Sequence, residues 1–261
     1  MVDSNWKEKY PFLEEIWKKY INDEFVNDGG DHLKFSLSCV SNVSHRDLTS
    51  VTEQIDICTK FLRNLKSLYT DAYDSGNFEK RCNNIYYWLY YEMKERKDYK
   101  GSIKNIIDAS NELIQKPIEK DGCYNSYLYE NFDETEKLVM LQIFIRNIVV
   151  IQEILNNKCD SNRTSCKKFI KECVDLYSMQ PYYSQTCNNP NSIIDKTCLA
   201  VKSFKEKYEE LRSSQKIKNE FPPLSTVTPE INIDLCLLEE RKTDQAFPLP
   251  SNQSEPSIIQ R

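Results

Sequence analysis

The segment LTSVTEQIDICTKFLRNLKSLY, residues 48–69, carries the most regular hydrophobic pattern of the chain. Its apolar residues recur at alternating intervals of three and four, which places them along one face of an α-helix. They are Leu48, Val51, Ile55, Cys58, Leu62, Leu65 and Tyr69. A coiled coil uses the same spacing, but only three heptads are present here, which favours packing inside a domain. We therefore predict a helix whose stripe faces the core of a helical domain.

Six further segments around this helix share helical periodicity. They are residues 6–25, 77–96, 102–116, 133–157, about 166–177 and 192–212. The segment 133–157 opens with a capping-box pair, Asp133 and Glu136, and is apolar around much of its circumference. We expect it to be the central helix. The sequence thus predicts an all-α bundle of about seven helices.

From residue 221 the composition changes, with FPPLSTVTPE and later FPLPSNQSEP rich in proline, serine and threonine. Neither stretch has helical or strand periodicity. We therefore predict a helical domain over residues 1–220 and an extended stalk or tail over 221–261.

Ten cysteines are spread through the chain, with no CxxC pair and no two closer than seven residues. Zinc sites bring cysteines together in close pairs or combine them with histidine, so the pattern does not indicate zinc. An even number of dispersed cysteines favours a disulfide framework in an oxidising compartment. Buried free thiols are the alternative. The disulfide candidates are Cys39, Cys58, Cys82, Cys123, Cys159, Cys166, Cys173, Cys187, Cys198 and Cys236.

Helix geometry restricts which of these cysteines can pair. Seven residues of helix separate Cys166 from Cys173 by about 10.5 Å along the axis, beyond the reach of a disulfide. Two local pairs that close short loops are hypotheses, Cys159 with Cys166 and Cys187 with Cys198.

No pattern of an active site stands out. GxSxG, GxxxxGK[ST], GxGxxG and HExxH are all missing. His32 and His45 fall in the polar connection between the first two predicted helices and read as solvated loop residues. We therefore expect a protein that is not an enzyme, with no catalytic residues, no cofactor and no bound metal.

Charge and hydropathy narrow the class of partner. A net charge of −5 and a pI near 5.3 argue against nucleic acid as a ligand. The longest apolar run, residues 138–151, has 14 residues and includes Arg146, so we expect a buried helix and no membrane span in this chain.

The aromatic segment IYYWLYY, residues 85–91, is the remaining cluster of note. We expect Trp88 in the core. A binding surface formed by outward tyrosines is the alternative. Three polar connections are candidate contact regions, residues 27–47, 116–131 and 179–192.

Several segments of the chain resemble the Plasmodium interspersed repeat (PIR) proteins, with the vir branch of Plasmodium vivax the most similar. The residues RCNNIYYWLY at 81–90 are the most specific part of this resemblance. It extends to YPFLEEIWKKY at 10–20, CTKFLRNLKSLY at 58–69, GCYNSYLYENFDETEK at 122–137, SCKKFIKECVDLY at 165–177 and TCLAVKSFKEKY at 197–208.

The resemblance implies a helical, disulfide-bonded ectodomain that the parasite exports to the infected red-cell surface or secretes. Trp88 matches the family's tryptophan, and six cysteines match family positions, namely Cys58, Cys82, Cys123, Cys166, Cys173 and Cys198. The family resemblance implies no catalytic residue.

The resemblance implies that the protein is a variant antigen that acts in adhesion and immune evasion. Its expected partner is a host protein such as an immune receptor, an immunoglobulin or a red-cell surface protein. The alternative is a structural or trafficking component of exported membranes that acts by helix–helix association, for which the stripe over 48–69 is the best support. The sequence does not determine the oligomeric state.

Overall fold

The computed structural model describes residues 5–23, 30–43, 50–70, 75–114, 132–157, 160–178, 194–214, 217–224, 231 and 233. Within these residues the regular elements are ten α-helices and a 3-10 turn, and no strand occurs. The predicted all-α, disulfide-stabilised class is confirmed.

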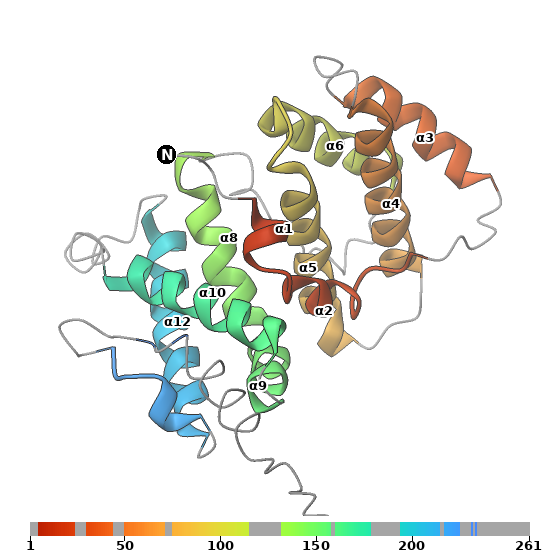
Figure 1. Cartoon of the computed structure of the whole chain (residues 1–261). Helices are drawn as coiled ribbons and strands as arrows, with labels where there is room; N and C mark the ends of the chain where they lie inside the picture. Colours follow the sequence, from red (N-terminus) through yellow and green to blue (C-terminus); the bar gives the residue numbers. More distant parts are fainter. Residues whose placement is uncertain are drawn as a thin grey trace, which may run out of the picture.

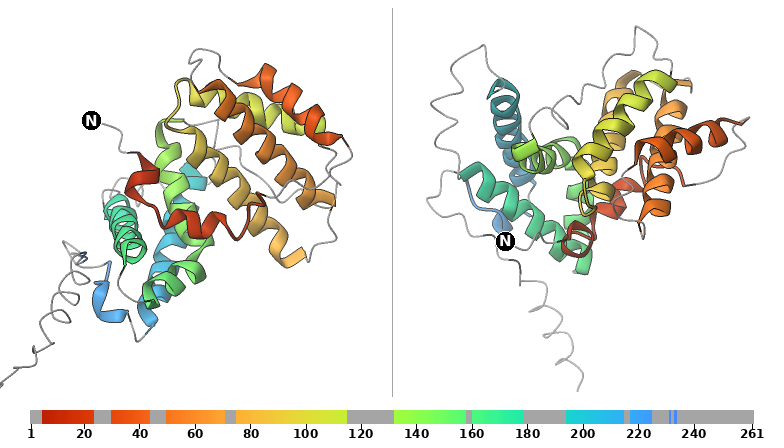
Figure 2. Two further views of the ribbon diagram at one scale, coloured as in Figure 1. Left: turned by 45° about the vertical axis from the view of Figure 1, so that its right-hand side comes forward. Right: turned by 90° about the horizontal axis from the view of Figure 1, so that it is seen from above.

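The helices form two groups that meet along the middle of the molecule (Figure 1). The first group contains α3 (Asp31–Asn42), α4 (Val51–Thr70), α5 (Ser75–Met93) and α6 (Tyr99–Leu113). The second contains α8 (Phe132–Arg146), α9 (Ile148–Asn156), α10 (Ser161–Ser178) and α12 (Ile194–Ser213). Contact between α5 and α8 joins the groups, and α3 lies at the outer edge of the first (Figure 2).

Helix α5 is buried on all sides over its middle. Each of the ten consecutive residues from Cys82 to Tyr91 is buried, Trp88 with 3% of its surface exposed. Its neighbours include α4, α6 and α8, so rings that point in different directions all meet other helices. The alternative of a tyrosine-lined binding surface over residues 85–91 is therefore wrong. We predicted that residues 133–157 form the central helix. Helix α8 of that segment does lie in the middle of the molecule, where it contacts α5.

The predicted helix over residues 6–25 is wrong, because the chain forms two short helices there, α1 (Trp6–Lys9) and α2 (Leu13–Trp17). Pro11 has no N–H to donate and disfavours helical geometry in the residue before it. Accordingly Tyr10 leaves the helical region, with φ −130° and ψ 58°.

This N-terminal segment contacts both groups of helices. The Trp6 indole N–H donates to Glu136 of α8 over 2.8 Å. On the other side, the Tyr91 hydroxyl of α5 donates to Glu14 over 2.9 Å. The segment thereby links α5 with α8.

The predicted helix over 133–157 is also divided, into α8 and α9, which meet at Asn147 with a bend of 72°. The Asn147 amide donates to the side-chain oxygen of Asn84 in α5 over 2.8 Å and to the Ile143 carbonyl over 3.0 Å. This pair of buried asparagines ties the bend to the central helix. Among the described helices none is by itself long and apolar enough to cross a membrane, whereas the bent pair passes that length and composition test when taken together.

The first residues of the predicted tail pack against the domain. Phe221 and Ile231 are buried, and the Tyr208 hydroxyl of α12 donates to the Pro222 carbonyl over 2.9 Å. The Arg212 guanidinium donates to the Phe221 carbonyl over the same distance. Residues after 233 lie outside the described part of the chain, so the division at 221 stays a prediction.

Candidate binding surface

Helix α3 corrects the expectation from the sequence, which places residues 27–47 in a polar connection between helices. Phe35, Cys39 and Val43 recur at intervals of four and are buried, which explains why this segment forms a helix against α4 and α6. Gly30 precedes it with φ 98°, a left-handed conformation that glycine adopts readily. His32 therefore lies in a helix and not in a loop, while His45 lies outside the described residues.

The opposite face of α3 exposes an apolar stripe. Leu33 is 65% exposed, Leu37 62% and Val40 42%, at positions i, i+4 and i+7 of one helix face. Five large hydrophobic side chains are exposed among the described residues, and three of them belong to this stripe. We call Leu33, Leu37 and Val40 the α3 stripe. Exposed apolar patches are typical of interaction surfaces, so this helix face is the candidate binding surface.

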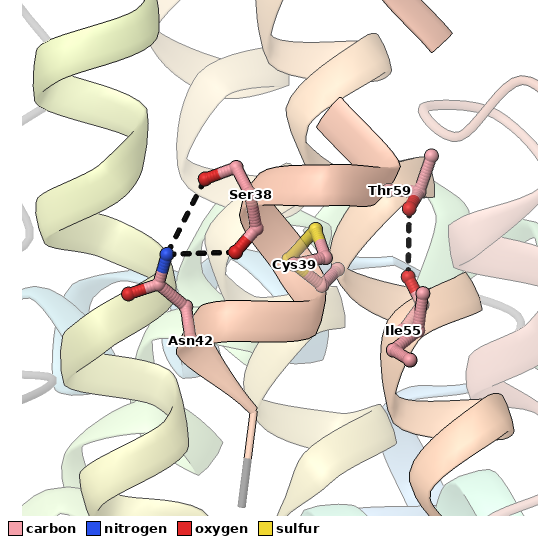
Figure 3. Close-up of a disulfide and its surroundings, with 6 residues drawn as sticks. Ser38, Cys39, Asn42, Ile55 and Thr59 are labelled. Atoms are coloured by element: carbon pink, nitrogen blue, oxygen red, sulfur yellow. Dashed lines mark hydrogen bonds between the residues drawn. A yellow bond between two sulfur atoms is a disulfide. The ribbon is translucent and has the colours of Figure 1, made fainter. Parts of the chain in front are cut away.

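A disulfide between Cys39 and Cys58 pins α3 to α4 (Figure 3). The two Cα atoms are 5.8 Å apart, within the ordinary range for a bridge. An ion pair between Asp31 and Lys66 adds a second tie between the same helices. Since Cys39 is fully buried on the face opposite the α3 stripe, the bridge holds the stripe outward.

Hydrogen bonds at both helices support the geometry next to the bridge (Figure 3). The Asn42 amide donates to the Ser38 carbonyl over 2.9 Å and lies 3.3 Å from its hydroxyl oxygen. In α4 the Thr59 hydroxyl donates to the Ile55 carbonyl over 2.8 Å. The α3 stripe is thus presented by a helix fixed through covalent, ionic and hydrogen-bonded contacts.

The other described cysteines divide into two kinds. Cys82 and Cys198 are disulfide-bonded. Cys166 and Cys173 are free buried thiols, so their prediction as bridge members is wrong, and the hypothesis of a Cys159–Cys166 pair is wrong with it. Both thiols sit fully buried in α10, where burial raises the pKa of each above its ordinary value and keeps it protonated. They behave as small core residues.

Four predicted bridge members, Cys123, Cys159, Cys187 and Cys236, lie outside the described residues, as do the candidate contact regions 116–131 and 179–192. The hypothesis of a Cys187–Cys198 pair therefore stays a prediction. In the part of the chain that the structure describes, no group of three or more His, Cys, Asp or Glu side chains is arranged to hold a metal ion.

A family model described as Plasmodium vivax Vir protein matches residues 13–220, which include α3 and both groups of helices. The chain belongs to the Vir family. Vir proteins are variant antigens of Plasmodium, and the resemblance inferred from the sequence is confirmed. Neither a curated protein nor a solved structure gives a match.

The α3 stripe of this Vir chain had a signal in its sequence. Apolar residues at 33, 37 and 40 interleave with apolar residues at 35, 39 and 43, so the segment has two hydrophobic faces. A helix with one face against the core leaves the second face outside. This pattern was not recognised as a helix because polar residues separate the apolar ones and because the helix has only 12 residues.

Proposed function

We propose that this variant antigen faces the host and binds a host protein through the α3 stripe. Its partner is a host immune receptor, immunoglobulin or red-cell surface protein, and the protein acts in adhesion and immune evasion after export. The observation that carries the proposal is the exposure of Leu33, Leu37 and Val40 on a helix held by the Cys39–Cys58 bridge. Membership of the Vir family supports the host-facing role.

The surroundings of the stripe suit a protein partner. Interfaces between proteins place apolar anchors at the centre and polar residues at the rim. Around the α3 stripe lie exposed Lys34 and Ser41 and half-buried Ser36. The backbone is fixed before binding, which lowers the entropy lost on association.

The stripe over 48–69 no longer supports the alternative role in helix–helix association. In α4, Leu62 and Leu65 are fully buried, and Cys58 forms the bridge to α3. These residues therefore have no free face for another chain.

Binding of the purified disulfide-intact chain to a panel of host immune-receptor ectodomains, immunoglobulins and red-cell surface proteins tests the proposal. Leu37→Glu places a charge in the stripe and should weaken binding about tenfold or more, the loss of one interface anchor. Leu199→Glu is the matched control, because Leu199 is 63% exposed on α12, away from the stripe. It should leave affinity unchanged.

Equal binding by the Leu37→Glu and Leu199→Glu variants would place the contact elsewhere and refute the α3 stripe. If the unmodified chain binds no member of the panel, the result counts against a host-binding role. Light scattering gives an independent measure, because a concentration-stable assembly favours the scaffolding alternative.

A further inference from the structure

A pocket of about 510 Å³ lies between the residues that follow α2 and the first turns of α5. This volume falls in the range of sites for small molecules, about 300–1,000 Å³. Four cationic side chains line it, from Lys18, Lys19, Lys80 and Arg81. It is separate from the α3 stripe and has no part in the function proposed above.

The charge of this pocket is opposite to that of the chain. The protein carries a net charge of −5, yet none of the described residues lining the pocket is acidic. A concave site lined by charges of one sign concentrates the electric field and attracts counter-ions. Such a site selects anions.

Two of the lysines are already paired, but through contacts that a ligand can displace. Lys19 forms an ion pair of 2.6 Å with Glu153, and Lys18 one of 2.8 Å with Glu15. All four side chains are more than 40% exposed, so water and salt screen both pairs. Exposed pairs of this kind contribute little stability, and an anion with several charges competes with them.

Lys80 is the cation most affected by its surroundings. Its ammonium lies 5.9 Å from the centre of the Tyr20 ring. Burial lowers the pKa of Lys80 and the positive charge of Lys19 lowers it further, while the Glu153 carboxylate acts in the opposite direction. An anion bound in the pocket stabilises the charged form of Lys80, because it replaces the hydration lost on burial and offsets the repulsion from Lys19.

The walls of the pocket are fixed in advance. The Asn22 backbone N–H donates to the Asn64 side-chain oxygen over 2.7 Å, and the Asn64 amide donates back to the Asn22 carbonyl over 3.1 Å. On the other wall, the Asn84 amide donates to the Lys80 carbonyl over 2.9 Å, at the start of the buried middle of α5. These contacts fix the backbone of both walls, which lowers the part of the binding entropy that ordering of the walls would cost.

We propose that the pocket formed by Lys18, Lys19, Lys80 and Arg81 binds a compact phosphate ester. A phosphate monoester carries between one and two negative charges near pH 7 and offers three strong acceptor oxygens. Ammonium and guanidinium groups donate charge-assisted hydrogen bonds to those oxygens. A singly charged carboxylate or sulfate ester matches a pocket lined by four cationic residues less well. The same phosphate chemistry occurs in soluble sugar phosphates and in phosphoinositide headgroups.

Isothermal titration calorimetry of the full disulfide-intact chain with inositol trisphosphate tests the proposal. We expect saturable binding that weakens as salt is added, and none to unphosphorylated inositol. Lys80→Ala and Lys80→Gln should each weaken binding about tenfold, the latter keeping most of the aliphatic stem. Lys205→Ala is the matched control, since it removes the same charge from an exposed position on α12. It should bind like the unmodified chain.

Sedimentation with phosphatidylcholine vesicles, with and without phosphatidylinositol bisphosphate, distinguishes the source of the phosphate. Binding of inositol trisphosphate without sedimentation of the vesicles supports the site and assigns it to soluble esters. Sedimentation with the phosphoinositide vesicles, but not with phosphatidylcholine alone, supports it and assigns it to a headgroup. Absence of both overturns the proposal. Equal loss in the Lys80 and Lys205 variants, with unchanged melting curves, also overturns it, because the attraction would then come from charge in general.

Discussion

Replacing Cys39 and Cys58 together by alanine should destabilise the domain by about 3 kcal/mol. The bridge closes a segment with a sequence separation of 19 residues. In the chain-entropy treatment, a loop of that size restricts the unfolded chain by about 11 cal/mol/K, which corresponds to about 3 kcal/mol at 25 °C. For a domain of this size, the melting temperature should fall by about 6–12 °C.

Urea denaturation followed by circular dichroism measures this loss directly. Alanine also removes two buried sulfur atoms, and that contribution needs a control. Cys166→Ala with Cys173→Ala removes two fully buried sulfur atoms from α10 without breaking a bridge. The difference between the two double variants isolates the crosslink.

The reasoning is refuted if both double variants lose the same free energy of unfolding. A second consequence concerns helix α3. Without the bridge, α3 is held only by noncovalent contacts such as the Asp31–Lys66 ion pair and the packing of Phe35. Hydrogen exchange in α3 should therefore become faster in the Cys39/Cys58 variant, while exchange in α10 should not change.

Four further outcomes follow from buried polar groups and buried thiols. Asn147→Leu leaves the Asn84 side-chain oxygen without its 2.8 Å donor and should cost about 1–3 kcal/mol in urea denaturation. Glu220→Gln removes the carboxylate that pairs with fully buried Lys167 and should cost about 3 kcal/mol or more, measured in the same way. Cys166 and Cys173 should resist iodoacetamide in the native protein and react after denaturation, as read by mass spectrometry. Because burial raises the pKa of both thiols above 9.0, the unfolded chain releases these protons first, and stability should fall as pH rises above about 9. Rapid labelling of the folded chain, or unchanged stability at alkaline pH, would contradict this.

Helical periodicity located most of the fold because it depends only on the order of apolar residues along the chain. The segment 48–69 became α4, and its stripe is buried as predicted at Leu62 and Leu65. About seven helices were predicted, against ten among the described residues. The difference arises from the breaks at Pro11 and Asn147 and from the omission of α3.

The break at Asn147 shows why such details escape a single sequence. An asparagine within an apolar run signals nothing until a partner for its amide is known. That partner, Asn84, is 63 residues away in the chain. Pro11, in contrast, is a local signal for a break in a helix. The apolar periodicity of its neighbours nevertheless led to the prediction of one continuous helix.

The sequence by itself determined the helical class, the core-facing stripe of α4 and membership of the Vir family, since each is written in the order of residues. Only the tertiary structure decided which cysteines are bridged, which face of α3 points outward and which lysines line the same pocket. These depend on distances between residues far apart in the chain. Cys39 reaches Cys58, and Lys80 reaches Tyr20, only because the packing of the helices brings them together.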